Sequence, residues 1–245
     1  MQWFSRMKMI GIIGAMEVEV EQLLGNMQET GSKTVSGVCF HEGTMVGVQC
    51  VVAQCGIGKV AAAVCTQTMI LLYHPQVILC EGVAGGIGKD VHIGDLVVAT
   101  SLVQHDMDSS ALGDPVGFIS ALQKVQMPVP SQTVALIADC AQDVYEGHVC
   151  KGVIATGDQF IANNDKLHQL AADFGAVACE MEGGSIAQVC CMAGVDYAVL
   201  RSISDNGDND AAVDFPTFAA ESAHKNTALL LAVLPKLAQQ LEKTK

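Results

Sequence analysis

Short hydrophobic runs alternate along this chain with longer stretches that have helical spacing. Runs such as Met9–Ile13 and Val77–Cys80 have the length and composition of buried strands, and glycine-rich turns follow several of them. This alternation predicts one doubly wound α/β domain with a parallel or mixed sheet. The further expected strands are Leu96–Thr100, Val149–Ala155 and Tyr197–Leu200, and the expected helices are Glu17–Met27, Lys59–Leu72, Ser131–Tyr145, Asn164–Asp173, Gly184–Met192 and Phe215–Leu241.

Three segments depart from that simple alternation. Val35–Glu42 and Val46–Ala53 are expected to pair as a hairpin around the residues that follow Glu42. Ser101–Pro130 has weak periodicity and three prolines, which is typical of a loop that is mobile or lies at an interface. Pro235 is expected to kink or end the C-terminal helix.

The charge balance limits the partners of this protein. The 245 residues carry a formal net charge of −13. Nucleic acids and anionic membranes are polyanions and are therefore disfavoured as partners. The substrate is expected to be small, and neutral or cationic.

Ten cysteines raise the question of disulfides or a zinc site. Their spacing contains no CxxC pair, and most lie within hydrophobic runs, which favours buried structural thiols in a reducing cytosol. The apolar run Met9–Met16 is too short for a membrane span and is followed by glutamates, which argues against a secretory signal. We therefore expect a cytoplasmic protein.

Charged residues gather where two apolar segments end. Glu180 and Glu182 follow Val177–Cys179, while Arg201 and Asp205 follow the strand Tyr197–Leu200. Ligands of open α/β sheets bind at such strand ends. Carboxylates in a desolvated place have shifted pKa values, so acid and base chemistry is expected there.

Two glycine loops and one aromatic residue could line a ligand. Neither Gly56–Lys59 nor Gly82–Gly86 fits the phosphate-binding patterns, so the glycines either let two backbones approach or line an uncharged ligand. Phe160 is either a core residue or a platform for a planar heterocycle.

Two acidic clusters have ordinary explanations. His105–Asp108 resembles a metal-ligand cluster, but no second cluster supplies further ligands, so hydrogen bonding within a loop is favoured and no metal is expected. Glu17 is expected to stabilise a helix N-terminus through the helix dipole. Glu19 is rotated away from it and is expected to face the sheet edge where the other carboxylates gather.

Eight motifs follow one another along the chain, from about Met7 to the C-terminal helix. They are Ile12–Glu19, Gly56–Ala63, Ala84–Gly86, His92–Asp95, His105–Asp108, Thr156–Ile161, Glu180–Glu182 and Arg201–Asp205. In this order they resemble the 5′-methylthioadenosine/S-adenosylhomocysteine nucleosidases of the purine nucleoside phosphorylase-like superfamily. The resemblance implies a single-domain three-layer α/β/α fold with a central mixed sheet, in which residues 1–6 are an extension and 7–245 form the nucleosidase domain.

The resemblance also implies roles for individual residues. Asp205 would be the acid that protonates the purine, Glu19 would activate the attacking water, and Glu182 would bind the ribose hydroxyls. Asp205 must then hold a proton near neutral pH. No cofactor is implied. For the substrate, Met181 would pack under the sugar, Phe160 and Ile161 would hold adenine, and Ser204 would support Asp205. The site would also be lined by Val83, Ala84, Gly85 and Glu180.

The resemblance further implies a homodimer. Ile57 and Phe215 would line the pocket for the 5′ substituent, and Leu112 and Pro115 would reach the neighbouring site from the 105–118 loop.

This chain departs from the family pattern at two places. The family's Thr-Gly-Ser-Ala-Gly-Gly type of loop is here Glu81-Gly-Val-Ala-Gly-Gly, so a hydroxyl is lost and a carboxylate gained. The segment from Asp108 to Phe118 is short, and Leu112 stands where an aromatic residue is common. The preferred 5′ group therefore stays open, with 5′-deoxyadenosine and 6-amino-6-deoxyfutalosine as further substrates to consider.

Two other functions compete with hydrolysis. A nucleoside phosphorylase of the same fold would bind phosphate through arginines or free amides, but the chain has only Arg6 and Arg201, and Glu19 would repel the anion. A non-catalytic nucleoside-binding domain would not need the acid and base that Asp205 and Glu19 supply. Hydrolysis of an adenine nucleoside is the favoured reading.

Overall fold

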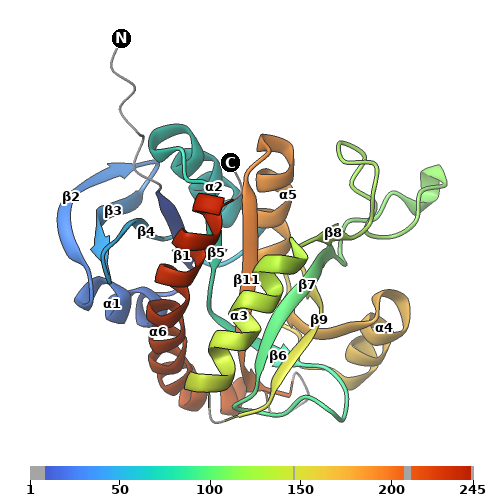
Figure 1. The fold of residues 1–245 in the computed structure, drawn as a ribbon. Coiled ribbons are helices and arrows are strands. Elements are labelled where there is room, and N and C mark those ends of the chain that lie inside the picture. Colours follow the sequence, from blue (N-terminus) through green and yellow to red (C-terminus); the bar gives the residue numbers. More distant parts are fainter. Residues whose placement is uncertain (1–8, 146, 207–210, 244–245) are drawn as a thin grey trace.

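In the part of the chain that the structure describes, eleven strands form one mixed sheet through the centre of the molecule (Figure 1). The computed structural model describes residues 9–145, 147–206 and 211–243. Within the last of these ranges, side chains are described only from residue 218 onward. The strands are β1 (Ile10–Gly14), β2 (Gln28–Val35), β3 (Val38–Met45), β4 (Val48–Gln54), β5 (Val77–Cys80), β6 (Val83–Gly86), β7 (Leu96–Gln104), β8 (Met127–Pro128), β9 (Val149–Thr156), β10 (Ala176–Glu180) and β11 (Asp196–Asp205). Their order is β2-β3-β4-β1-β5-β11-β6-β10-β9-β7-β8.

Helices cover both faces of the sheet, which confirms the three-layer α/β/α arrangement with a mixed sheet. On one face α6 (Ala211–Lys243) packs against α1 (Glu17–Gly25) and α3 (Ser131–Val144). On the other face α2 (Lys59–Tyr73) packs against α5 (Gly183–Ala193). The remaining helical segments are α4 (Asn164–Phe174), beside β9 and β10, and the short 3-10 helix η1 (Ser110–Leu112).

The long strand β11 joins the two halves of the sheet. Its first residues, Asp196–Val199, run parallel to β5, and Leu200–Ser202 pair antiparallel with β7. Its last residues, up to Asp205, pair with β6. Because β6, β10, β9 and β7 follow one another in the sheet, the β11–β7 pairing closes these five strands into a ring. The ring places the carboxyl ends of β10 and β11 on either side of β6.

The predicted hairpin is confirmed by the antiparallel pairing of β3 with β4, but its turn lies at Val46-Gly47, where φ is positive. A second turn at Ser36-Gly37 adds strand β2, which pairs with the other side of β3. Gly43, expected in the turn, lies inside β3, where an added Cβ would be 2.4 Å from the carbonyl oxygen of Gln28. Glycine is needed there because the two backbones approach closely beside a bulge in β2.

Three other boundaries were predicted wrongly. Val83–Gly86, expected as a glycine loop, is strand β6, because β10 and β11 supply hydrogen-bonding partners on both sides. Strand β7 extends to Gln104 and so takes the first residues of the expected loop Ser101–Pro130. Helix α6 continues past Pro235 to Lys243, and Leu237 beyond the proline is buried, so Pro235 does not end the core-packed part of the helix; a kink there stays a prediction. The expected extension of residues 1–6 lies outside the described residues.

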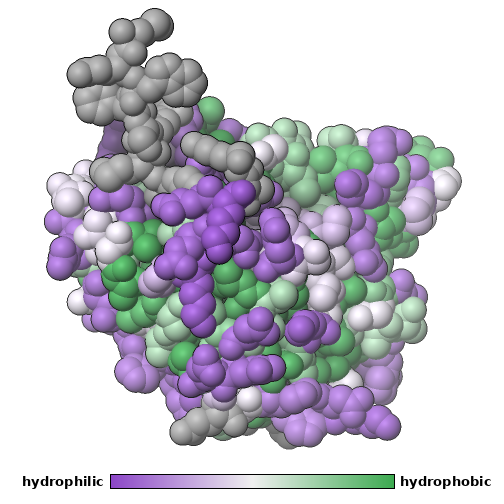
Figure 2. Space-filling model, in the orientation of Figure 1, coloured by the Kyte–Doolittle hydropathy of each residue, from purple (hydrophilic) through white to green (hydrophobic). Residues whose placement is uncertain are grey.

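The core and the surface agree with the composition. All ten cysteines are free, and seven are buried, which agrees with the interpretation as structural thiols. Hydrophilic and hydrophobic residues are interspersed on the face formed by α6 and α3 (Figure 2). No helix within the described ranges combines the length and the apolar character that crossing a membrane requires.

Candidate active site

A cleft of about 600 Å³ opens beside β6, between the carboxyl ends of β10 and β11 and the start of α1. The structure brings twelve of the residues predicted from the sequence to this cleft. They are Glu19, Ile57, Val83, Ala84, Gly85, Phe160, Ile161, Glu180, Met181, Glu182, Ser204 and Asp205.

Leu112 and Pro115 do not line this cleft within one chain, and Leu112 is 87% exposed. The side chain of Phe215 lies outside the described residues. Sequence reasoning also missed four lining residues, although each sits within or next to a quoted motif. They are Ala15, Met16, Gln159 and Cys179.

Glu19 is held in place by the backbone around it. Its Oε2 accepts hydrogen bonds from the backbone N–H groups of Ala15 at 2.7 Å and Met16 at 2.9 Å, and its Oε1 accepts one from Val83 at 3.3 Å. The side chain is 2% exposed, whereas Glu17 is exposed. Burial raises the pKa of Glu19, while nearby Arg201 and these N–H groups oppose the rise. The expectation that Glu19 turns inward and Glu17 does not is confirmed.

Arg201 is the buried cation of the site, and Glu180 is its close partner. The guanidinium Nη2 lies 2.5 Å from Glu180 Oε2 and 3.7 Å from Glu182 Oε2. Glu180 also accepts hydrogen bonds from the backbone of Glu182 and Gly183 and from the hydroxyl of Thr156. The carboxylate oxygens of Glu180 are thus taken up by protein donors. Two of these donors are backbone N–H groups at the start of α5, which Glu180 therefore holds in place.

Glu182 stands at the N-terminus of α5 and is less well paired. Its Oε1 accepts a 2.9 Å hydrogen bond from the backbone N–H of Gly58, at the start of α2. Burial, and then the negative charge of Glu180, raise the pKa of Glu182 to about 7, against the opposing effect of Arg201. A carboxyl group of this kind changes charge near neutral pH and is a candidate functional group.

Asp205 ends β11 at the bottom of the cleft. It is 3% exposed, and its Oδ2 accepts a 2.8 Å hydrogen bond from the hydroxyl of Ser204. The same hydroxyl lies 3.5 Å from the carbonyl oxygen of Ala84 on the neighbouring strand β6. The pairing of β11 with β6 thus positions both residues.

The mouth of the cleft is hydrophobic. Phe160 is 51% exposed and Ile57 is 61% exposed, although both line the cleft. Of the two interpretations of Phe160, a wall of the site rather than a core residue is therefore correct. An aromatic ring at this place offers a planar face for stacking.

The two glycine loops contact the carboxylates of the cleft directly. Gly58, with φ of 96°, gives its N–H to Glu182. An added Cβ at Gly82 would lie 2.7 Å from both Arg201 Nη1 and Glu19 Oε1, so this position has no room for a side chain. Between the two interpretations of these glycines, close approach holds at Gly82, while Gly85 lines the cleft.

The segment His105–Asp108 makes loop hydrogen bonds, as expected. Asp106 accepts from Lys59 Nζ at 2.6 Å and from the backbone of Asp158 at 2.9 Å, and Asp108 accepts from the backbone of Ser110 at 2.8 Å. These contacts tie the start of α2 to the loop after β9.

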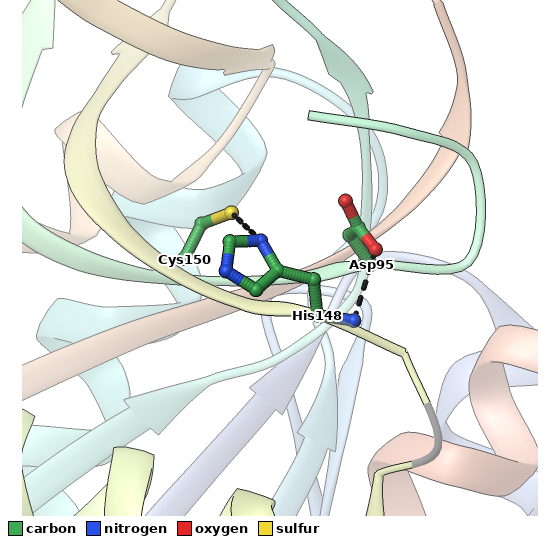
Figure 3. Close-up of side chains that lie close together, drawn as sticks. All are labelled: Asp95, His148 and Cys150. Atoms are coloured by element: carbon green, nitrogen blue, oxygen red, sulfur yellow. Dashed lines mark hydrogen bonds between the residues drawn. The ribbon is translucent and has the colours of Figure 1, made fainter. Parts of the chain in front are cut away.

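A separate group of potential metal ligands lies at the other end of β9. One ligand atom each from Asp95, His148 and Cys150 fall within 4.8 Å of one another. Figure 3 shows the imidazole of His148 turned toward Cys150, with Asp95 facing the backbone nitrogen of His148. Both oxygens of Asp95 already accept backbone N–H groups, from His92 and His148. Burial and nearby aspartates raise the pKa of the Cys150 thiol. These contacts fit a structural role for the cluster.

Comparison with known proteins agrees with this geometry. The family model of the phosphorylase superfamily matches residues 9–235. A 5′-methylthioadenosine/S-adenosylhomocysteine nucleosidase of Shewanella halifaxensis is 37% identical over 229 residues, which are 93% of this chain and 99% of that protein.

Two solved structures of Helicobacter pylori proteins are also similar. One is a mutant of its 5′-methylthioadenosine/S-adenosylhomocysteine nucleosidase with 5′-methylthioadenosine in the active site, with 38% identity, a TM-score of 0.88, and coverage of 94% of this chain and 99% of that one. The other is its futalosine hydrolase, with 38% identity, a TM-score of 0.88, and coverage of 94% and 98%.

Proposed function

The chain belongs to the 5′-methylthioadenosine/S-adenosylhomocysteine nucleosidase family, and we propose that Asp205, Glu19 and Glu182 carry out its reaction. The protein is an N-glycosyl hydrolase, which breaks the N-ribosidic bond of adenosine derivatives. The observation that supports the assignment best is that four buried carboxyl groups line one cleft, and that three of them, Glu19, Glu182 and Asp205, are not taken up by a close ion pair with Arg201.

Asp205 acts as the general acid. Adenine leaves poorly as an anion, so its N7 must receive a proton as the bond to the ribose stretches. The buried position of Asp205 suits a carboxyl group that holds a proton for this purpose, and the hydroxyl of Ser204 orients it. Phe160 and the backbone of Ile161 hold the adenine ring against this acid.

Glu19 acts as the base toward water. The three backbone N–H groups that bind its carboxylate favour the ionised form and fix its orientation. In the reaction the water oxygen forms a bond with the anomeric carbon, and Glu19 takes the proton that the water loses. Proton transfers of this kind contribute roughly 10²- to 10⁴-fold each to the rate.

Glu182 binds the ribose hydroxyls. As the N-ribosidic bond breaks, positive charge develops on the sugar, and a preorganised carboxylate nearby stabilises it. Glu182 lies at the cleft next to Met181, which packs under the sugar. Its single strong protein hydrogen bond, from Gly58, leaves acceptor capacity for two hydroxyl groups.

Phosphate is not the second substrate. Arg201 is the only arginine among the described residues. Its guanidinium Nη2 contacts the carboxylates of Glu180 and Glu182 and the sulfur of Cys80. Lys59 is similarly engaged by Asp106. A phosphate would also meet Glu19 at the position of attack, where like charges repel.

The protein acts as a homodimer in which the partner closes the 5′ end of the cleft. Several large hydrophobic side chains are exposed around the mouth and along α2, among them Ile57 and Val60, which is 74% exposed. Leu112, at 87% exposed, projects from the 105–118 loop and would reach the second cleft together with Pro115. A second copy of the chain is the occupant that would both cover this surface and complete the site.

The reaction is expected to take place in the cytoplasm. All ten thiols are free, and a reducing compartment keeps thiols in that state.

The test of this function is adenine release from 5′-methylthioadenosine, followed chromatographically with and without phosphate. Free adenine and free methylthioribose in phosphate-free buffer are expected. Release that depends on phosphate and yields a sugar phosphate would contradict the role of Glu19. S-adenosylhomocysteine, 5′-deoxyadenosine and 6-amino-6-deoxyfutalosine, tested in parallel, would establish the preferred 5′ group.

A further inference from the structure

Glu81 is a buried carboxyl group that the mechanism above does not use. It follows β5, is 1% exposed, and does not line the cleft. It is also the position at which this chain carries a carboxylate in place of the family's threonine. A carboxyl group that is fully removed from water is costly unless it has a partner or stays neutral.

The hydrogen bonds of Asn226 show which oxygen of Glu81 is an acceptor. Asn226 Nδ2 contacts the carbonyl oxygen of Gly82 at 3.0 Å, and a carbonyl can only accept, so this atom is the amide donor. The same Nδ2 donates to Glu81 Oε2 at 3.1 Å. On the other side, Asn226 Oδ1 accepts from the hydroxyls of Ser202 at 2.7 Å and Tyr145 at 3.1 Å. The orientation of this amide on α6 is therefore fixed by partners on β11, just after α3 and just after β5.

The second oxygen of Glu81 faces the segment that carries Glu19. Oε1 is buried and has no hydrogen-bond partner within the described chain. An added Cβ at Gly14 would lie 3.1 Å from Glu81 Oε1 and 3.2 Å from the Cβ of Glu19. Both glutamate side chains therefore contact the same side of Gly14, at the end of β1.

Burial, together with the negative charge of Glu19, favours the neutral form of Glu81. Burial raises its pKa well above the usual value, and the negative charge of Glu19 raises it further. Arg201 and the amide of Asn226 oppose this rise with a smaller effect. Tyr145, the other ionisable group of the network, has its own pKa raised to about 12 by burial and is uncharged at neutral pH. Since Oε2 is an acceptor, the proton of neutral Glu81 belongs on Oε1.

We propose that Glu81 is a positioning residue that acts through Glu19: it stays protonated on Oε1, so that the two carboxyl groups carry one negative charge and that charge lies on Glu19. The O–H group of Glu81 is directed at the side of Gly14 where Glu19 lies, which favours the ionised form of Glu19. During the reaction the proton from water moves to Glu19, and Glu81 keeps its own. This inference rests on the proposed role of Glu19 as the base.

The proton itself is tested without reference to activity. Infrared spectra of the full-length protein with isotope-labelled glutamate, recorded at about pH 8, where Glu182 is ionised, report neutral glutamic acid through its carbonyl band. A band that is present in the wild type, Glu19→Gln and Glu182→Gln proteins and lost in Glu81→Gln is expected. A spectrum in which Glu81→Gln loses no band, or in which Glu19→Gln loses it instead, overturns the proposal.

Kinetics then test the action on Glu19. Glu81→Gln keeps an acceptor for Asn226 and a neutral donor in place of Oε1–H, so kcat/KM is expected within about threefold of the wild type at pH 7. Glu81→Met has similar size but no donor, so the acidic limb of the kcat/KM profile is expected to move about one pH unit upward, with an approximately tenfold loss at pH 6.

Other outcomes separate this proposal from its rivals. If Glu81→Met loses stability but its acidic limb stays in place, the role of Glu81 is only structural and the proposal fails. If Glu81→Gln loses activity as severely as Glu19→Gln, Glu81 works as an anion and the proposal also fails. If Glu19→Gln is fully active, the base has been misassigned, whereas the infrared result still decides the protonation of Glu81.

Discussion

The guanidinium of Arg201 lies 2.5 Å from the carboxylate of Glu180, inside a site where both side chains are 2% exposed. Both charges are buried, so water cannot solvate either one if its partner is removed. Removing one member of a buried ion pair leaves the other charge uncompensated.

Replacement of Arg201 by methionine is therefore expected to lower the free energy of unfolding by about 3–5 kcal/mol. Urea unfolding at pH 7, followed by circular dichroism, measures the change. Lys225→Met is the matched control, because its ion pair with Glu221 on α6 is accessible to solvent and should contribute much less to stability. A loss in Arg201→Met no larger than that of the control would contradict the prediction.

The raised pKa of Glu182 predicts a pH-dependent stability of the ligand-free protein. A carboxyl whose pKa is higher in the folded state stabilises the fold below its unfolded pKa, and this stabilisation is lost as pH rises through the folded value of about 7. Glu182→Gln stays neutral at every pH. It should match the wild type near pH 5 and be more stable by about 3 kcal/mol near pH 8, as measured by urea unfolding. Equal stability of the two proteins at both pH values would show that the pKa of Glu182 is not raised.

The acid and the base are each expected to be needed for turnover. Asp205→Asn and Glu19→Gln should each lower kcat for adenine release by about 10²- to 10⁴-fold, because each removes one proton transfer. Glu17→Gln is a control on the same helix, since Glu17 is exposed and points away from the cleft. Far-UV circular dichroism should show that all three variants are folded. Near wild-type turnover in Asp205→Asn or Glu19→Gln would remove that residue from the mechanism.

The predicted dimer is tested by a charge placed on its surface. Val60 is 74% exposed on α2, and Val60→Glu would bury an unpaired carboxylate in the interface. A penalty of about 2 kcal/mol corresponds to roughly thirtyfold weaker association, visible by analytical ultracentrifugation. KM for 5′-methylthioadenosine should rise with it, because the partner closes the 5′ end of the cleft.

Thr34→Glu adds the same charge to β2, the exposed edge strand of the sheet, and should leave association and KM unchanged. A wild type that sediments as a monomer, or a Val60→Glu protein that associates as tightly as the wild type, would contradict the proposed interface.

The charged residues of the cleft could be predicted from the sequence because they follow apolar runs, whereas most of its uncharged lining was implied only by the family resemblance. Glu180, Arg201 and Asp205 each end or interrupt a buried strand, and strand ends of an α/β sheet converge. Glu19 was assigned to the cleft from its rotation relative to Glu17 on one helix. These are local relationships, which the sequence records directly.

What could not be predicted depends on contacts distant in sequence. Val83–Gly86 has the composition of a loop and becomes a strand only because β10 and β11 lie on either side of it. Gly43 resembles a turn residue, but its role is to admit the backbone of β2. The tie between Asn226 and Glu81 spans 145 residues, and no local pattern indicates it.

Because β11 is continuous, catalytic activity is expected to depend on the same strand that connects the two parts of the sheet. One strand pairs with β5 in the first half of the sheet and with β7 and β6 in the ring, and its carboxyl end carries Ser204 and Asp205. Its residues after Asp196 are all buried, so its amide hydrogens should exchange with solvent only when the fold opens globally. Asp205 should then lose its position in the cleft only when the whole protein unfolds. The loss of activity on heating should therefore follow the same temperature curve as unfolding.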